Sequence, residues 1–251
     1  MKKLFTLFSI FYLLFSFPAC GKKRPFGFTG KENEEQAFNK CVRLSSKKQF
    51  QEAVDCLEIF KSRYPDSKYS GEAELRIADT YFAKKEYLLS AETYLLFAKL
   101  HPTSEKLDYT FYRAGLCYWH AAPKSVDRNQ ENLPEAVDNF RTVVSQYSTS
   151  PYAKMAKVKY DEARRRIANR HYYIGKLYYR WGEYLAAIPR FKEIIDHYSH
   201  LGLDEEALYF MAISYNNLGK IEEAKVVAEL MKEEFPDSKR TKKITNRLKK
   251  S

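Results

Sequence analysis

Side chains able to do chemistry are present in this chain, but they are scattered. His197 and His200 are spaced closely enough to share a metal ion, but two surface histidines are the favoured interpretation of this pair. Acidic pairs such as Glu205-Glu206 stand among lysines and arginines, which is typical of solvated helix faces with local ion pairs. No glycine-rich phosphate loop, nucleophile elbow or paired-histidine zinc helix occurs. We therefore expect neither an enzyme nor a bound metal or cofactor.

The first of the four cysteines, Cys20, belongs to an export signal. Two lysines precede an apolar stretch over positions 4–17, which is too short to span a bilayer as a helix. A charged start, a short apolar core and a break are typical of a signal peptide, and cleavage before a cysteine resembles the bacterial lipoprotein signal. We expect residues 1–19 to be removed and Cys20 to be lipidated, with plain secretion as the alternative.

The other three cysteines lack C-x-x-C spacing and make no zinc pattern. Cys41 and Cys117 fall on small-residue positions of a helical pattern, so buried thiols are the favoured interpretation. Cys41 and Cys56 are expected on opposing helices of one hairpin. Because export permits disulfides, a Cys41–Cys56 bridge stays open as the less favoured alternative.

We expect these residues to lie on helices, because one pattern of bulky and small residues recurs five times along the chain. A bulky residue is followed by a small one three positions later, a bulky or apolar one four further on, and usually an aromatic one seven after that. The five instances are Phe50/Ala53/Leu57/Tyr64, Tyr87/Ser90/Tyr94/His101, Leu133/Ala136/Phe140/Tyr147, Tyr184/Ala187/Phe191/Tyr198 and Ile221/Ala224/Ala228/Phe235. Such a pattern predicts stacked helical hairpins, and the scarcity of glycine and proline favours an all-α fold.

A second column of small residues precedes these blocks and shows where the array is irregular. Its members are Cys41, Ala78, Gly115, Gly175 and Ala212, which are 37 residues apart except for the 60 between Gly115 and Gly175. Nine extra residues lie around 123–131, and fourteen more precede Gly175. Because fourteen residues are almost four helical turns, a lengthened helix would present the same face. We predict one long helix over 151–180.

The chain therefore divides into five segments. Residues 1–19 are the signal peptide, and residues 20–32 form a lipidated N-terminus and flexible tether. Repeats one to three occupy 33–147, the long helix and repeats four and five occupy 148–238, and 239–251 form a basic tail, expected as a solvated helix end. A formal charge of +11 on an exported chain favours anionic lipids or acidic protein faces over nucleic acid. The best aromatic contact candidates outside the columns are Phe26, Phe28 and Trp119.

The motifs resemble two nested families. The small, aromatic, small and bulky positions Gly175, Tyr178, Ala187 and Phe191, with prolines at 65, 102 and 236, resemble the tetratricopeptide family. Three further stretches narrow the match, namely Arg63-Tyr64-Pro65, Asp127-Arg128 with Gln130, and the block from Tyr178 to Arg190. Over about residues 33–238 the chain resembles the lipoproteins of the outer-membrane β-barrel assembly machinery. The resemblance implies an all-α, right-handed superhelical array of five tetratricopeptide-like hairpins.

The same resemblance implies a non-enzymatic scaffold at the outer membrane, held by the lipid on Cys20 and facing the periplasm. Its C-terminal repeats would hold the periplasmic domains of a BamA-like protein, and its N-terminal repeats would meet unfolded outer-membrane β-barrel proteins. Other lipoproteins of the machinery are further implied partners. The alternatives are another tetratricopeptide lipoprotein adaptor, such as a pilotin or a cell-division coordinator, and, less favoured, an exported enzyme.

Site residues follow from the same resemblance. Arg190 matches an arginine linked to the BamA contact, and Asp127, Arg128 and Tyr184 are assigned to the same partner surface. Tyr64 matches a tyrosine linked to substrate, although it also occupies a packing column and packing is the favoured interpretation.

Overall fold

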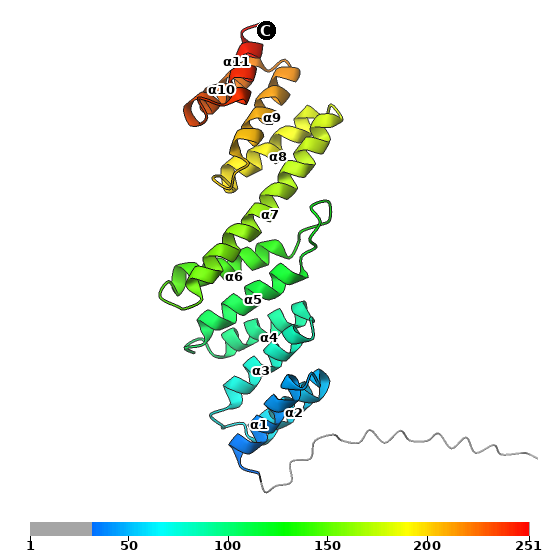
Figure 1. Ribbon diagram of the computed structural model, residues 1–251, viewed down its shortest axis with the longest axis vertical. Helices are drawn as coiled ribbons and strands as arrows, with labels where there is room; N and C mark the ends of the chain where they lie inside the picture. The colour runs from blue at the N-terminus through cyan, green and yellow to red at the C-terminus, as the bar shows by residue number, and fades with distance from the viewer. Residues whose placement is uncertain (1–31, 251) are drawn as a thin grey trace, which may run out of the picture.

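The computed structural model describes residues 32–250, and within that range it contains helices and no strand. The helices form antiparallel hairpins stacked along one long axis, with the N-terminal end and the C-terminus at opposite ends (Figure 1). This confirms the predicted all-α array of five hairpins. The first helices of the hairpins are α1 (Glu34–Ser46), α3 (Ser70–Ala83), α5 (Leu107–Ala121), α7 (Ala153–Arg180) and α9 (Asp204–Asn217). The second helices are α2 (Phe50–Arg63), α4 (Tyr87–Leu100), α6 (Leu133–Gln146), α8 (Tyr184–His197) and α10 (Ile221–Glu234), and α11 (Lys239–Leu248) closes the array.

The two columns of small residues let the helices of each hairpin approach closely. All members of the second-helix column are fully buried: Ala53, Ser90, Ala136, Ala187 and Ala224. In the first-helix column, a Cβ added at Gly115 would lie 2.7 Å from the Phe140 ring, and one at Gly175 would lie 2.8 Å from the Phe191 ring. Glycine is therefore required at these two positions by the bulk of the facing phenylalanine.

Four of the five hairpins turn through one residue in the left-handed backbone region. Gly182 and Gly219 have φ of 80° and 72°, and Lys48 and Lys85 occupy the same position in their hairpins with φ of 61° and 67°. The residue after each turn donates a backbone hydrogen bond five residues back, as in Glu183 to Tyr178 at 3.0 Å, which is the Schellman arrangement. The third hairpin instead carries the predicted nine-residue insertion as a loop between α5 and α6 (Figure 1).

The predicted long helix is confirmed as α7, a helix of 28 residues that begins two residues after the expected start. Its first half packs against α6 and its second half against α8. The buried side of the helix carries Ala156, Ala163, Ile167 and Ala168, followed by Gly175. One continuous helix therefore joins repeats one to three to repeats four and five (Figure 1).

The expectation of a buried thiol at Cys41 is wrong. Cys41 and Cys56 form a disulfide, with their Cα atoms 5.3 Å apart. Both residues are fully buried on facing sides of α1 and α2, so the helix faces agree, which the sequence spacing alone did not establish. Cys117 is a buried free thiol as predicted. Its Sγ donates to Ser90 Oγ at 3.2 Å, and burial raises the pKa of this thiol to about 11.

The expectation of a solvated C-terminal tail is also wrong. Thr241, Ile244 and Leu248 on α11 are buried, so this helix closes the core of the fifth hairpin. The Ser238 side chain accepts hydrogen bonds from the first backbone N–H groups of α11. The lysines lie on the outer side, because the apolar residues recur at helical spacing within a basic sequence.

The signal peptide, Cys20 and the tether up to residue 31 lie outside the described residues. Within 32–250, no helix combines the length and the hydrophobicity needed to cross a membrane.

Candidate functional site

A groove of about 380 Å³ lies on the face formed by the first helices of successive hairpins. Leu75 of α3 and Tyr109 of α5 supply apolar surface, together with Pro151 and Tyr152 just before α7. The charged lining residues are four carboxylates and two cations, namely Glu72, Asp79, Glu105, Asp108, Arg76 and Lys106. The groove is therefore part apolar and part acidic, which suits an extended segment carrying apolar and basic side chains.

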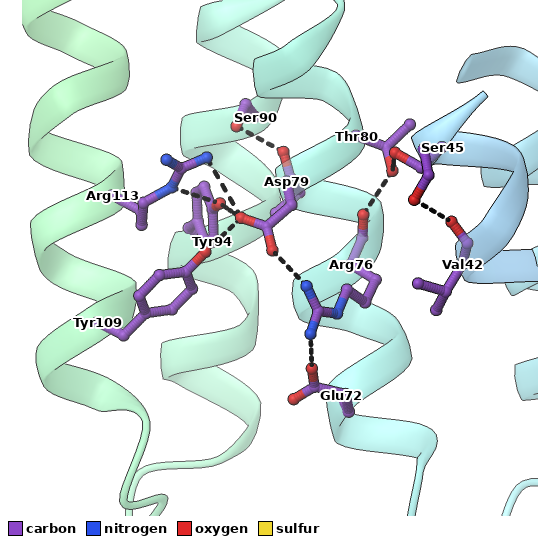
Figure 2. A network of polar contacts seen from close by, with 12 residues as sticks. Val42, Ser45, Glu72, Arg76, Asp79, Thr80, Ser90, Tyr94, Tyr109 and Arg113 are labelled. Carbon is purple, nitrogen blue, oxygen red and sulfur yellow. Dashed lines mark hydrogen bonds and ion pairs between the residues drawn. The ribbon is translucent and has the colours of Figure 1, made fainter. Parts of the chain in front are cut away.

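Asp79 organises the floor of this groove (Figure 2). Its carboxylate accepts hydrogen bonds from the hydroxyls of Tyr94 and Tyr109, and the Arg113 guanidinium lies 3.2 Å away. Arg113 Nε also donates to the Tyr94 hydroxyl at 2.9 Å. Burial, and then the negative charge of Asp79, raise the pKa of both tyrosines, so both hydroxyls stay protonated and keep donating. The network ties α3, α4 and α5 into one rigid unit.

Arg76 extends the network to the groove rim (Figure 2). Its guanidinium lies 2.8 Å from the Glu72 carboxylate and 3.7 Å from that of Asp79, and its side chain is 46% exposed. Because Arg76 already has two acidic partners, it offers little uncompensated positive charge to a ligand. The acidic character of the groove is thus carried by Glu105 and Asp108 at the edge.

Gln130 holds the loop between α5 and α6 in shape. This side chain is buried, and its amide nitrogen donates to the carbonyls of Pro123, Ser125 and Arg128 at 2.9 to 3.2 Å. Its amide oxygen accepts a hydrogen bond from Arg166 of α7 at 3.0 Å. One side chain therefore replaces the backbone hydrogen bonds that an irregular loop lacks.

The braced loop presents Asp127 and Arg128 to solvent. Arg170 of α7 donates to the carbonyl of Val126 at 2.7 Å, so the loop is fixed on the α7 side next to the exposed pair. A hydrogen bond from Ser125 lowers the pKa of Asp127, which keeps this exposed carboxyl ionised. The predicted residues Asp127 and Arg128 are accessible on a well-supported loop.

Arg190 lies on α8, close to the same region of α7. Its Cβ would be 3.2 Å from a Cβ at Gly175, its side chain is partly buried, and it makes no ion pair within residues 32–250. Burial lowers the pKa of His171 on α7, Glu193 opposes this, and the positive charges of Arg190 and Arg170 reinforce it. Arg190 and the arginine that braces the loop thus both lie near His171.

Tyr184, at the start of α8, lies beside an exposed apolar patch that the sequence did not reveal. Its ring is 5.6 Å from that of Tyr179, while Trp181 and Leu185 next to it are each 65% exposed. Trp181 directly follows Arg180, the last residue of α7, and its side chain turns outward. Trp119, expected to be exposed, is partly buried beneath Lys159, whose Nζ lies 4.2 Å from the ring centroid.

Tyr64 lies in the first hairpin, at the other end of the molecule from α8 (Figure 1). Its ring is 5.2 Å from that of Phe60, and it packs against the core of that hairpin. Its hydroxyl donates to the Glu32 carbonyl at 3.4 Å. The favoured packing interpretation is confirmed, and the structure does not bring Tyr64 together with the other four site residues.

The fold and these surfaces define a helical-repeat protein whose recognisable features are grooves and side-chain clusters. No group of three potential metal ligands occurs between residues 32 and 250. The chain belongs to the YfiO family of outer membrane lipoproteins, whose model matches residues 31–230. The match ends before α11, so that helix lies beyond the family model.

Two named relatives support this assignment. The chain is 28% identical over 202 residues to the outer membrane protein assembly factor BamD of Rickettsia prowazekii, covering 80% of each chain. It is 29% identical to the BamD of Caulobacter vibrioides, covering 74% of this chain and 60% of that relative. Among solved structures, the TPR2AB-domain complex of yeast Sti1 is similar with a TM-score of 0.41, at 15% identity over 83% of this chain and 80% of that one. Both relatives are named as assembly factors, not as pilotins or cell-division coordinators.

Proposed function

We propose that this protein is a scaffold of outer-membrane β-barrel assembly, anchored by the lipid on Cys20 and facing the periplasm. It would act by binding alone, without making or breaking a bond. The observation that carries the proposal is the arrangement of two unlike surfaces on one rigid array. A part-apolar, acidic groove lies over α3, α5 and the start of α7, and a braced loop with Arg190 lies near the middle of α7.

In this proposal the C-terminal surface holds the periplasmic domains of a BamA-like protein. Arg190 is the central anchor because it is partly buried and has no acidic partner within the described chain, so a carboxylate on the partner would pair with it. Asp127 and Arg128 on the braced loop, and Tyr184 beside the exposed Trp181, complete the surface.

The N-terminal surface would receive extended segments of unfolded barrel proteins. The groove offers apolar walls for alternate side chains and carboxylates for basic ones, while the Asp79 network prevents it from collapsing. Tyr64 is kept as a substrate contact only through its exposed part, since much of its ring packs in the first hairpin.

Charge reversal at Arg190 tests the partner surface. We expect Arg190→Glu to lose most of the BamA-like protein that co-purifies from solubilised outer membranes, because a charge-paired anchor typically contributes about 2 kcal/mol or more. Lys192→Glu is the matched control, since Lys192 lies on the same helix but is 59% exposed and already paired with Asp196. Normal recovery of the partner with Arg190→Glu would refute the site.

Charge reversal in the groove tests the substrate surface separately. We expect Glu105→Lys to weaken binding of a lysine-containing peptide from the last strand of a barrel protein by about fivefold, measured by fluorescence anisotropy at low salt. Glu92→Lys on the exposed side of α4 is the control outside the groove. Equal affinity for both variants would show that the peptide binds elsewhere.

A further inference from the structure

Helix α4 exposes more large apolar side chains than any other helix between residues 32 and 250. Leu88, Leu89, Leu96 and Leu100 are 48%, 42%, 54% and 58% exposed. The buried side of α4 is also apolar, so the helix has almost no polar face. A helix of this kind in a soluble array indicates a surface that something covers.

Three of these leucines line a groove between α2 and α4. This groove has a volume of about 180 Å³, and Leu89, Leu96 and Leu100 form one wall while Ile77 and Tyr81 of α3 lie within it. It faces away from the acidic groove described above, since it opens between second helices of the hairpins. The proposed function leaves it without a role.

Acidic groups dominate the rim of the α2–α4 groove. Glu58 and Glu74 share one cation, Lys61, at 3.7 Å and 3.5 Å. Burial raises the pKa of Tyr81, and the next contributions come from the negative charges of Glu58 and Glu86. A ligand with aromatic and basic side chains would match both the wall and the rim.

The chain itself supplies such a segment immediately before the first described residue. Residues 21–31 contain Phe26 and Phe28, four basic residues and no acidic one. The Glu32 carbonyl accepts from the Tyr64 hydroxyl at 3.4 Å, and Lys61 on the groove rim is one helical turn before Tyr64. The chain therefore enters the array close to the mouth of the groove.

The length of the tether limits how far its aromatic residues lie from the array. Phe28 is four residues and Phe26 six residues before Glu32, which allows at most about 14 Å and 22 Å of extended chain. A tethered segment also has a high effective concentration, so it outcompetes a free partner of equal intrinsic affinity.

We propose that the α2–α4 groove is the docking site of the chain's own N-terminal segment, with Phe26 and Phe28 against the leucines of α4. Docking would leave only residues 21–25 between the docked segment and Cys20. The second-helix face of repeat two would then lie toward whatever surface holds that cysteine, and this would fix the orientation of the array. The docking itself does not depend on lipidation or on the partner sites.

Photo-crosslinking in the purified full-length chain tests this contact. With benzoylphenylalanine in place of Phe28, we expect an intramolecular cross-link that mass spectrometry maps to residues 86–100. The yield should fall roughly tenfold when Leu96→Glu and Leu100→Glu are added, because both contacts are apolar. Leu185→Glu, at an equally exposed leucine on α8, should leave the yield unchanged.

Other outcomes overturn the proposal. Cross-links to detergent or lipid, to a second copy, or to a co-purified protein would each identify a different occupant. A cross-link to α4 that survives the two glutamates, or one that scatters over α1 and α2, would show that the groove does not direct the segment. Both leucines are more than half exposed, so the double variant is expected to fold, and an unchanged far-ultraviolet circular dichroism spectrum confirms that it does.

Discussion

Adding a single methyl group at Gly175 should destabilise the protein although it improves the helix. Alanine in the interior of α7 would gain about 0.8–1.0 kcal/mol in helix propensity over glycine. The new Cβ would however lie 2.8 Å and 2.9 Å from two atoms of the Phe191 ring and 3.2 Å from the Arg190 Cβ. Phe191 is fully buried and stacks on Phe210 with centroids 5.6 Å apart, so the ring has nowhere to retreat.

The balance of these two effects fixes the expected sign. Overpacking a tight core typically costs about 1–3 kcal/mol, so Gly175→Ala should lower the free energy of unfolding by about 1 kcal/mol. Gly71→Ala, in the first turn of α3, is the control without a clash, because its Cβ would meet Phe97 at an ordinary 3.6 Å, and stability should stay unchanged or rise.

Urea unfolding followed by circular dichroism and tryptophan fluorescence measures the effect. Repeat arrays can unfold in parts, so both signals are compared before a single free energy is assigned. Trp181 follows the end of α7 and reports on that region. Phe191→Leu should recover part of the loss in the Gly175→Ala background, with a coupling energy of about 0.5 kcal/mol or more. A Gly175→Ala protein at least as stable as Gly71→Ala would refute the close-approach argument.

Three further predictions concern stability and the loop. Replacing both Cys41 and Cys56 by serine should lower the stability of the first hairpin by about 3 kcal/mol, because the disulfide closes a loop of 15 residues. Amide exchange in α1 and α2 should then become faster, and unchanged exchange would contradict this prediction. Gln130→Ala should speed proteolytic cleavage within the α5–α6 loop severalfold, while Asn129→Ala, on an exposed side chain, should not. Burial lowers the pKa of His171 below 6.5, so the stability contributed by its neutral form is present above pH 6.5 and is lost as the pH falls through the folded-state pKa. His171→Gln should therefore flatten the drop in the urea midpoint between pH 7 and 5, and an unchanged drop would exclude this role.

The helical elements could be predicted because they depend on local periodicity. The spacing of the small and bulky columns predicted every hairpin, and the fourteen added residues predicted α7 to within two residues at its start. Apolar residues at three- and four-residue steps produce one buried face whatever the chain does elsewhere. The nine-residue insertion was found in the same way, because Tyr118 and Leu133 are nine positions further apart than the corresponding residues Tyr81 and Tyr87.

The groups that shape the candidate sites could not be found in this way. The Asp79 carboxylate accepts hydrogen bonds from the hydroxyls of Tyr94 and Tyr109, which are 15 and 30 residues further along the chain. Gln130 was visible only as part of a motif, and its bracing by Arg166 of α7 spans 36 residues. These contacts depend on how neighbouring hairpins rotate against each other, and a repeat pattern does not encode that rotation.

Side-chain size and spacing along the chain were enough to predict a stack of helical hairpins with one lengthened helix, because they decide which helix faces can approach. Three features became known from the folded chain alone: Cys41 bonds to Cys56, α11 packs against the fifth hairpin, and the leucines of α4 stay exposed. Each of these depends on the relative orientation of two helix faces. A few neighbouring residues decide which face a helix presents. Which other helix packs against that face depends on the path of the chain that connects the two helices.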